Sequence, residues 1–154
     1  MREPVYLDYN ATTPVAPDVI KAVMQGMSEV FGNPSSSHDR GRRASTLVAE
    51  ARESVARLIG ARAHEVIFTG CATEANNLAL LGVARACSKD KRHLVVSAVE
   101  HPAVMAPARQ LEREGWALTV VPVDGFGRVS AAEVEAALRP DTALVSVMHA
   151  NNEV

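Results

Sequence analysis

Three clusters of polar residues each follow a short apolar run in this 154-residue sequence: residues 69–73, 100–101 and 149–152. The first contains two threonines among small residues, the second a glutamate and a histidine, and the third a histidine and two asparagines. The threonine, histidine and asparagine side chains can donate hydrogen bonds to an anion, and a histidine can transfer a proton near neutral pH. Because ligands bind beyond the carboxyl ends of parallel strands, the three clusters together predict one ligand pocket.

The cluster at residues 69–73 is the candidate for binding a phosphate. Residues 66–68 are β-branched or aromatic and predict a buried strand, and a helical pattern follows Thr73. A strand, a turn of small residues and a helix leave backbone N–H groups free for an anion, with Thr69 and Thr73 as further hydroxyl donors. Small residues also occur at such turns for packing alone, so both interpretations stay open at this point.

The elements that must position these clusters alternate along the chain. Apolar runs predict strands at residues 5–7, 66–68, 93–97, 117–123 and 142–148. Helical patterns lie between the later runs, with Gly60 as a C-terminal cap and a capping box from Ser130 to Glu133. This alternation predicts right-handed βαβ crossovers and a mainly parallel sheet.

Composition narrows the class of protein. The sequence is 47% hydrophobic and 22% charged, with a net charge of −2, which is ordinary for a soluble globular domain. This balance argues against direct binding to nucleic acid or to a membrane surface. Cys71 and Cys87 have neither metal-site nor disulfide spacing, so no metal is expected. Without a signal-peptide pattern or an apolar stretch of membrane-spanning length, a cytoplasmic location is expected.

Five motifs in order carry a family resemblance: residues 6–14 (YLDYNATTP), 32–38 (GNPSSSH), 68–74 (FTGCATE), 100–101 (EH) and 149–153 (HANNE). Together they resemble the N-terminal part of the pyridoxal-phosphate (PLP) dependent cysteine desulfurases of the iron–sulfur-cluster and nitrogen-fixation type. These enzymes are class V aminotransferases of PLP fold type I. The resemblance implies a three-layer α/β fold with a mainly parallel sheet, incomplete in this chain. It assigns residues 1–15 to the small domain and active-site loop, and residues 16–154 to the PLP-binding large domain.

The resemblance also implies roles for single residues. Ala72 and Thr73 match positions that bind the cofactor phosphate. His101 matches the catalytic histidine that stacks on the pyridine ring and assists proton transfer, and Asn152 matches the asparagine that bonds the phenolic oxygen. Four loop residues match positions near the substrate or the dimer partner: Asn10, Ala11, Thr12 and Asn33.

Other family positions are changed or missing. Cys71 stands where glycine is usual and Asn76 where aspartate is common. An anionic phosphate opposes thiolate formation, so Cys71 is interpreted as packing rather than as a nucleophile. The family's Schiff-base lysine and nucleophilic cysteine come later in its chain than Val154. We therefore expect an N-terminal part of the enzyme, either truncated or split, which is inactive alone.

The implied activity of the parent protein is the conversion of L-cysteine to L-alanine. Sulfur would pass as an enzyme persulfide to a sulfur acceptor or iron–sulfur scaffold protein, for cluster assembly or tRNA thiolation. A homodimer, a complementary C-terminal chain, or both are expected as partners. Two alternatives stay open: a non-catalytic remnant that acts as a binding or dimerisation module, and another class V PLP enzyme such as a selenocysteine lyase or a kynureninase-like hydrolase.

Overall fold

The computed structural model describes residues 4–153. The chain forms two compact units, one that ends at Phe68 and one that begins at Thr69. The first three residues of the predicted N-terminal segment lie outside the described residues, as does Val154. The predicted domain boundary between residues 15 and 16 stays a prediction.

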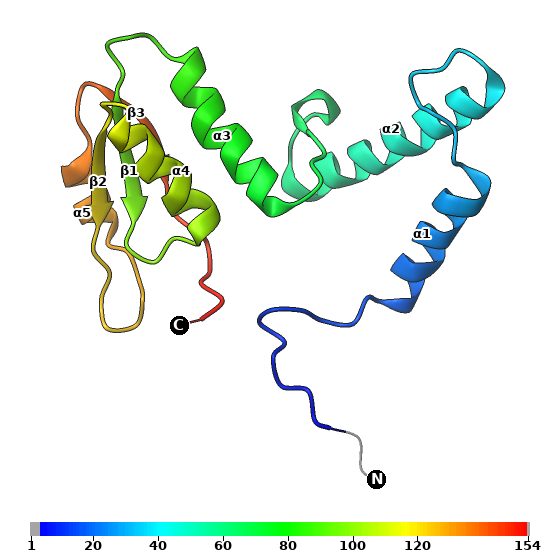
Figure 1. Ribbon diagram of the computed structural model, residues 1–154, viewed down its shortest axis with the longest axis horizontal. Coiled ribbons are helices and arrows are strands. Elements are labelled where there is room, and N and C mark those ends of the chain that lie inside the picture. Colours follow the sequence, from blue (N-terminus) through cyan, green and yellow to red (C-terminus); the bar gives the residue numbers. More distant parts are fainter. Residues whose placement is uncertain (1–3, 154) are drawn as a thin grey trace. The chain divides into compact units, whose positions relative to one another are not determined.

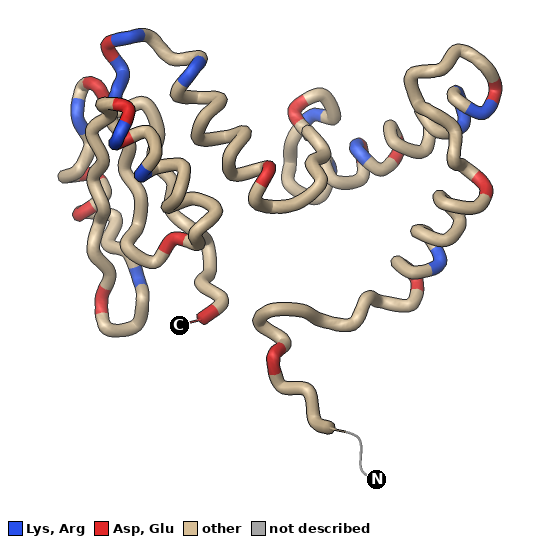
Figure 2. Tube along the Cα trace, viewed as in Figure 1, with Lys and Arg blue, Asp and Glu red and all other residues tan. Residues whose placement is uncertain are grey.

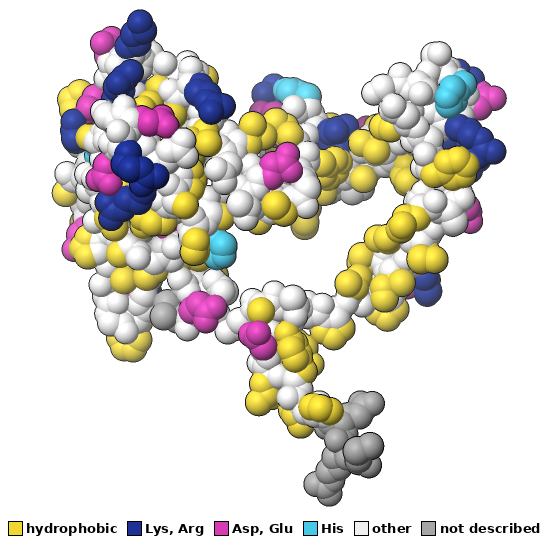
Figure 3. Space-filling view, in the orientation of Figure 1, with side chains coloured by type: hydrophobic (Ala, Val, Ile, Leu, Met, Phe, Trp, Pro, Cys, Tyr) yellow, Lys and Arg dark blue, Asp and Glu magenta, His cyan; other side chains and the backbone are white. Residues whose placement is uncertain are grey.

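The first unit contains α1 (Pro17–Glu29), α2 (Asp39–Ile59) and the short 3-10 helix η1 (Ala63–Glu65). A proline begins α1, where a missing backbone N–H costs no hydrogen bond. The apolar residues of α1 repeat at helical spacing, yet the described residues bury none of them, and Met27 is 72% exposed. Figure 3 shows this row of apolar side chains. α1 therefore presents an exposed apolar stripe.

Both ends of α2 are capped. His38 Nδ1 accepts a hydrogen bond from the Gly41 amide at 3.3 Å. A Cβ on Gly41 would lie 2.2 Å from the Ser36 carbonyl oxygen, so only glycine lets this turn approach the preceding loop. Gly60 ends the helix in the left-handed conformation, with φ of 67°. The predicted glycine cap is confirmed, because a left-handed residue strongly favours glycine.

The second unit is the α/β part of the chain (Figure 1). Its elements in order are α3 (Ala72–Ala86), β1 (His93–Ser97), α4 (Pro102–Arg113), β2 (Ala117–Val121), α5 (Ala131–Ala137) and β3 (Thr142–Ser146). Both strand pairs are parallel, and β1 lies in the middle of the order β2-β1-β3. The three strands carry no charged residue, and the charges of this unit lie on helices and loops (Figure 2). The predicted parallel sheet is confirmed.

One hydrophobic core joins α3 and α4 to β1. Leu94 and Val96 of β1 are 1% exposed and pack with Leu80 of α3 and with Val104 and Leu111 of α4. Because side chains alternate along a strand, Leu94 and Val96 share one face of the sheet. Both helices therefore cover that face.

The strand order places α5 on the face of the sheet opposite α3 and α4. The chain leaves β1 to reach β2 on one side, then returns past β1 to reach β3. Since parallel crossovers are right-handed, α4 and α5 must lie on opposite faces, and Figure 1 shows them flanking the strands. This arrangement confirms the three-layer fold. At β1 and β3 the direction of winding reverses, and such a point leaves a crevice at the carboxyl ends of the strands.

Two of the predicted strands do not form within the described chain: residues 5–7 and 66–68. Ile67 is 70% exposed, so the second segment is not buried either. The Val66 carbonyl accepts a hydrogen bond from Arg52 Nε at 3.2 Å, and the same guanidinium lies 5.3 Å from the Phe68 ring centroid. β-Branched residues favour extended backbone, but a strand also needs a neighbouring strand, which a short run cannot specify.

Smaller corrections concern the ends of elements. β2 stops at Val121 and β3 at Ser146, before the predicted residues 123 and 148. Val123 instead forms an isolated antiparallel bridge with Val129. Ser130 precedes α5 as predicted, but its side chain makes no cap bond, so the predicted capping box is wrong.

His93 ties the three strands together from the middle strand. The residue is fully buried, and its ring nitrogens bond the hydroxyls of Thr142 and Thr119, each at 2.8 Å. A neutral imidazole has one donor and one acceptor, and a rotating hydroxyl can match either. Burial lowers the pKa of His93 below its ordinary value of 6.5, with the Arg139 charge as a smaller cause.

This shift predicts that acid destabilises the fold. The unfolded chain binds the His93 proton more readily, so the free energy of unfolding should fall as pH drops below about 6.5. Replacing His93 with Gln should flatten this pH dependence, measured by chemical denaturation between pH 5 and 8 (~3 units that bracket the histidine pKa). The exposed His64→Gln variant is the control. Equal slopes in His93→Gln and in the unchanged protein would contradict the assignment.

Candidate functional site

A single carboxylate joins the loops that follow β1 and β3. Glu100 Oε1 accepts hydrogen bonds from the Ser97 hydroxyl and from the Met148 amide, both at 2.7 Å. Ser97 is the last residue of β1 and is fully buried, so the sheet holds one of the two donors. The spacing of the two loops is therefore set where the sheet reverses its winding.

A second bond joins the same loops. The Asn151 side-chain amide donates to the Val99 carbonyl at 2.9 Å, and its Oδ1 accepts from the Glu153 amide at 2.6 Å. Asn152 is exposed, and its side-chain amide donates to Glu153 Oε1 at 2.9 Å. Asn151 thus links the segment containing Asn152 to the loop that ends in His101.

His101 caps the start of α4. Its Nδ1 accepts a hydrogen bond from the Ala103 amide at 3.0 Å, and Pro102 occupies the first helical position. A neutral imidazole that accepts at Nδ1 carries its proton on Nε2. The residue is exposed, so a ring face and the Nε2–H group are available to a ligand.

The start of α3 offers backbone donors to an anion. Cys71 precedes the helix and is exposed, and in the described chain its side chain makes no cap bond. Cys71 therefore does not pack as predicted. The first-turn amides of Ala72 and Thr73 stay open, and the helix macrodipole adds partial positive charge there. The Thr69 hydroxyl donates to the Cys71 carbonyl at 3.1 Å, so of the two predicted hydroxyl donors only that of Thr73 is left for a ligand.

One groove of about 430 Å³ runs between α3 and α4. Thr73 and Asn77 line it from α3, and His101 and Gln110 line it from the α4 side. The structure therefore brings Thr73 and His101 together. Ala72 lies beside Thr73 in the first turn of α3, and neither Ala72 nor Asn152 is among the groove-lining residues.

The other predicted site residues lie in the first unit. Asn10, Ala11 and Thr12 belong to one exposed turn, in which the amides of Ala11 and Thr12 bond the Asp8 carbonyl at 3.2 and 3.3 Å. Asn33 is also exposed, and its Oδ1 accepts from the Ser35 amide at 2.9 Å. These local bonds explain the residue types, and proximity to the substrate stays a prediction.

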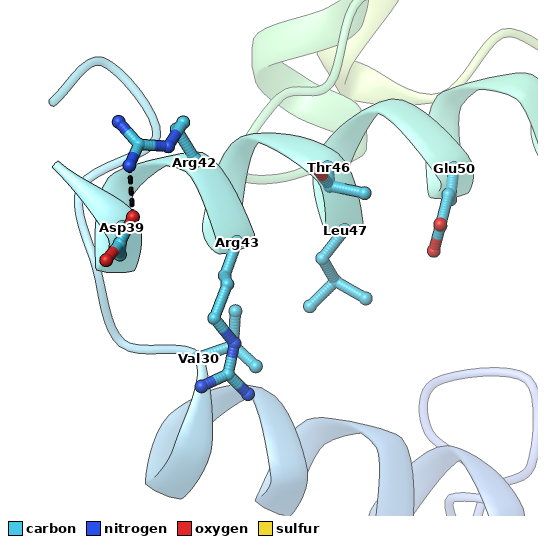
Figure 4. A pocket seen from close by; sticks show the side chains of 7 residues that line it. All are labelled: Val30, Asp39, Arg42, Arg43, Thr46, Leu47 and Glu50. Carbon is cyan, nitrogen blue, oxygen red and sulfur yellow. Dashed lines mark hydrogen bonds and ion pairs between the residues drawn. The ribbon is translucent and has the colours of Figure 1, made fainter. Parts of the chain in front are cut away.

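The first unit also has a hollow of about 640 Å³ at the start of α2 (Figure 4). Seven residues line it: Val30, Asp39, Arg42, Arg43, Thr46, Leu47 and Glu50. Arg42 pairs with Asp39, and the Arg42 side chain is 64% exposed. Two cations and two anions on an exposed helix face do not select an anionic ligand. This hollow is therefore not the phosphate site.

An uncapped helix start beside an exposed histidine, at the carboxyl edge of a parallel sheet, defines an α/β domain suited to a phosphorylated ligand. The sequence profile of the family described as Aminotransferase class-V matches residues 5–154. The chain belongs to this family.

Similar proteins extend the comparison. The chain is 49% identical over 154 residues to "Cysteine desulfurase IscS" of Dictyoglomus turgidum, and it covers 39% of that protein. It is 45% identical over 149 residues to "Cysteine desulfurase 1" of Trichormus variabilis, covering 97% of this chain and 37% of that protein. The chain thus spans about two fifths of the length of these curated relatives.

Solved structures with the same fold include two similar chains. "NIFS-LIKE PROTEIN" aligns with a TM-score of 0.90 and 41% identity, over 94% of this chain and 40% of that one. "SspA in complex with cysteine" aligns with a TM-score of 0.91 and 39% identity, over 97% of this chain and 43% of that one. The chain thus shares its mixed α/β fold with a parallel sheet with these solved structures.

Sequence reasoning missed the residues that hold the loops in place. The sequence alone indicates Glu100 only as a polar neighbour of His101, and it predicts no separate role for Ser97 or Asn151. The available signal is a glutamate shortly after a strand and directly before a helix-capping histidine, because such a glutamate must either face solvent or bond the strand ends.

Two kinds of feature are absent from residues 4–153. No helix in this range is long and apolar enough to cross a membrane. The same range holds no group of His, Cys, Asp and Glu side chains arranged to bind a metal ion.

The cap geometry predicts how His101 variants affect stability. His101→Ala removes the acceptor of the Ala103 amide and should lower the free energy of unfolding by about 1 kcal/mol, while His101→Asn keeps a capping acceptor and should cost less. Chemical denaturation of the variants measures the difference. If Ala and Asn prove equally stable, the cap bond makes no net contribution.

Proposed function

We propose that this chain forms the cofactor-binding part of a cysteine desulfurase, which converts L-cysteine to L-alanine and transfers the sulfur as an enzyme persulfide. The observation that carries the proposal is that Thr73, in the first turn of α3, and His101, at the start of α4, line the same groove. The names of the curated relatives and the cysteine complex of one similar structure support cysteine as the substrate.

The described residues fit PLP as the cofactor. The open first-turn amides of Ala72 and Thr73 suit its phosphate, the exposed ring of His101 suits its flat pyridine, and the amide of Asn152 suits its phenolic oxygen. When bound, PLP supplies an electron sink for the bonds at the substrate Cα.

His101 is the residue of this chain that we assign to proton transfer. Because the Ala103 amide occupies Nδ1, the exchangeable proton of the neutral ring is on Nε2, and exposure leaves that atom free to act. The same cap bond fixes the ring, so the proton is held at a defined position.

The lysines of this chain favour an incomplete active site. Lys89 and Lys91 lie in the loop before β1, and Lys91 Nζ donates to the Pro140 carbonyl at 2.6 Å, at the amino end of the sheet. Lys21 pairs with Asp18 on α1 at 3.0 Å. The proposed site is at the carboxyl end, so neither lysine of the second unit suits the role of a cofactor-bound lysine. This chain taken alone should act as a binding module.

The proposed partners follow from the same activity. We propose that the chain forms a homodimer or pairs with a complementary C-terminal chain. We further propose that it passes sulfur to a sulfur-acceptor or iron–sulfur scaffold protein. The proposed location is the cytoplasm. The N-terminal loop residues Asn10, Ala11, Thr12 and Asn33 are proposed to lie near the substrate or the dimer partner.

The test uses the full-length product of the gene that encodes this chain, supplied with PLP, L-cysteine and a thiol reductant. We expect equal amounts of L-alanine and sulfide, and His101→Asn should lower kcat/KM by about 10²-fold or more because proton transfer is lost while the cap is kept. Alanine and sulfide are quantified separately.

The controls separate the alternatives. A higher kcat/KM for L-selenocysteine than for L-cysteine would replace the proposal with a selenocysteine lyase. Alanine release from kynurenine would replace it with a kynureninase-like hydrolase. Absence of product from all three substrates would leave the non-catalytic binding module.

A charge at the phosphate cradle provides a second test. Thr73→Asp places a carboxylate in the first turn of α3, where the macrodipole tolerates it, so the fold should be kept. The carboxylate should repel the phosphate and raise the dissociation constant for PLP by about tenfold or more. Thr73→Asn is the neutral control of similar size. An unchanged affinity for PLP in Thr73→Asp would place the phosphate elsewhere.

A further inference from the structure

The two side chains assigned to the cofactor ring, His101 and Asn152, come from different loops. His101 ends the loop after β1, and Asn152 lies in the segment after β3. Their spacing therefore depends on whatever holds these two loops together. Two hydrogen-bonded ties do so, one through Glu100 and one through Asn151.

In the tie through Glu100, a single oxygen accepts from the end of β1 and from the loop after β3. Oε1 accepts hydrogen bonds from the hydroxyl of Ser97, at the end of β1, and from the backbone amide of Met148, in the loop after β3. Each distance is 2.7 Å. Ser97 is fully buried, and Glu100 and Met148 are half-buried. Hydrogen bonds to a carboxylate are short and strong, and partial burial shields them from water.

We propose that Glu100 is a positioning residue, whose Oε1 clamps the loop carrying His101 to the loop carrying Asn152 and so sets the spacing at which they contact PLP. The inference rests on the proposed function, because it needs the cofactor at this edge. Glu100 precedes His101 directly, so a shift of its backbone moves the start of α4 and the capping ring with it. The remaining tie from Asn151 to Val99 keeps the loops near each other when Glu100 is changed.

Two conservative variants separate the effect of the length of the Glu100 side chain from the effect of its negative charge. Glu100→Gln keeps the length and an amide oxygen that can accept both hydrogen bonds, but loses the charge. Glu100→Asp keeps the charge, but it is one methylene shorter and cannot reach both donors from the same backbone. The exposed Glu135→Ala on α5 is the matched control.

The experiment titrates PLP into the cofactor-free full-length gene product. Three quantities are measured for each variant: the dissociation constant, the absorbance spectrum of bound PLP, and the thermal unfolding temperature of the cofactor-free protein. We expect Glu100→Asp to weaken PLP binding by about tenfold and to shift the bound spectrum, because Asn152 and His101 lose their spacing. Glu100→Gln and Glu135→Ala should bind within about threefold of the unchanged protein, with its spectrum.

The opposite ranking of the two variants in PLP affinity overturns the inference. If Glu100→Asp binds PLP normally and Glu100→Gln does not, the negative charge matters and positioning does not. If both variants bind normally with an unchanged spectrum, the clamp has no role in cofactor binding. A loss of affinity accompanied by an equal loss of thermal stability in the cofactor-free protein, without a spectral change, reduces Glu100 to a structural residue. If the unchanged protein itself fails to bind PLP, the proposed function falls, and this inference with it.

Discussion

The middle strand is the constraint on which the second unit depends. β1 pairs in parallel with a strand on each side, and all five of its residues are buried. Parallel strands are stable only when both faces of the sheet are covered, which requires helices on both sides. Leu94 and Val96 satisfy one face, and His93 and Val95 lie on the other. The end of β1 is therefore fully buried, and Ser97 is located there.

The site follows from the direction of the chain. A helix that connects parallel strands begins at the carboxyl edge, so α4 starts there immediately after β1. α3 precedes β1 and packs on the same face, so its start lies toward the same edge. Two helix starts thus meet beside the crevice, and both contribute partial positive charge. The backbone of the two helix starts therefore already favours an anionic ligand at this edge, independently of the side chains.

Residue patterns within one element were predictable, and bonds between elements were not. The apolar run of residues 93–97 is long enough to fill both faces of a middle strand, and its strand formed as predicted. The run at residues 66–68 is also apolar, yet in the described chain its partner is the Arg52 side chain. Strand formation there depends on a neighbour that local sequence does not specify. Thr73 is predicted by the strand–turn–helix pattern, and the role of His101 is implied by the family resemblance. The clamp of Glu100, in contrast, joins residues 48 positions apart and has no local pattern.

The loop ties explain how a site on irregular backbone holds its geometry without a ligand. Loops are usually mobile, and ordering them on binding would cost affinity. The Glu100 and Asn151 bonds order these loops during folding. The buried Ser97, at the end of β1, anchors the Glu100 tie, and the Val99 carbonyl, in the loop just after β1, anchors the Asn151 tie. Under the proposed function, the cofactor would meet donors that these bonds already hold in place, which is the condition under which fixed dipoles stabilise charge most effectively. The two ties thus connect the buried end of β1 to the loops that carry His101 and Asn152, which belong to no strand.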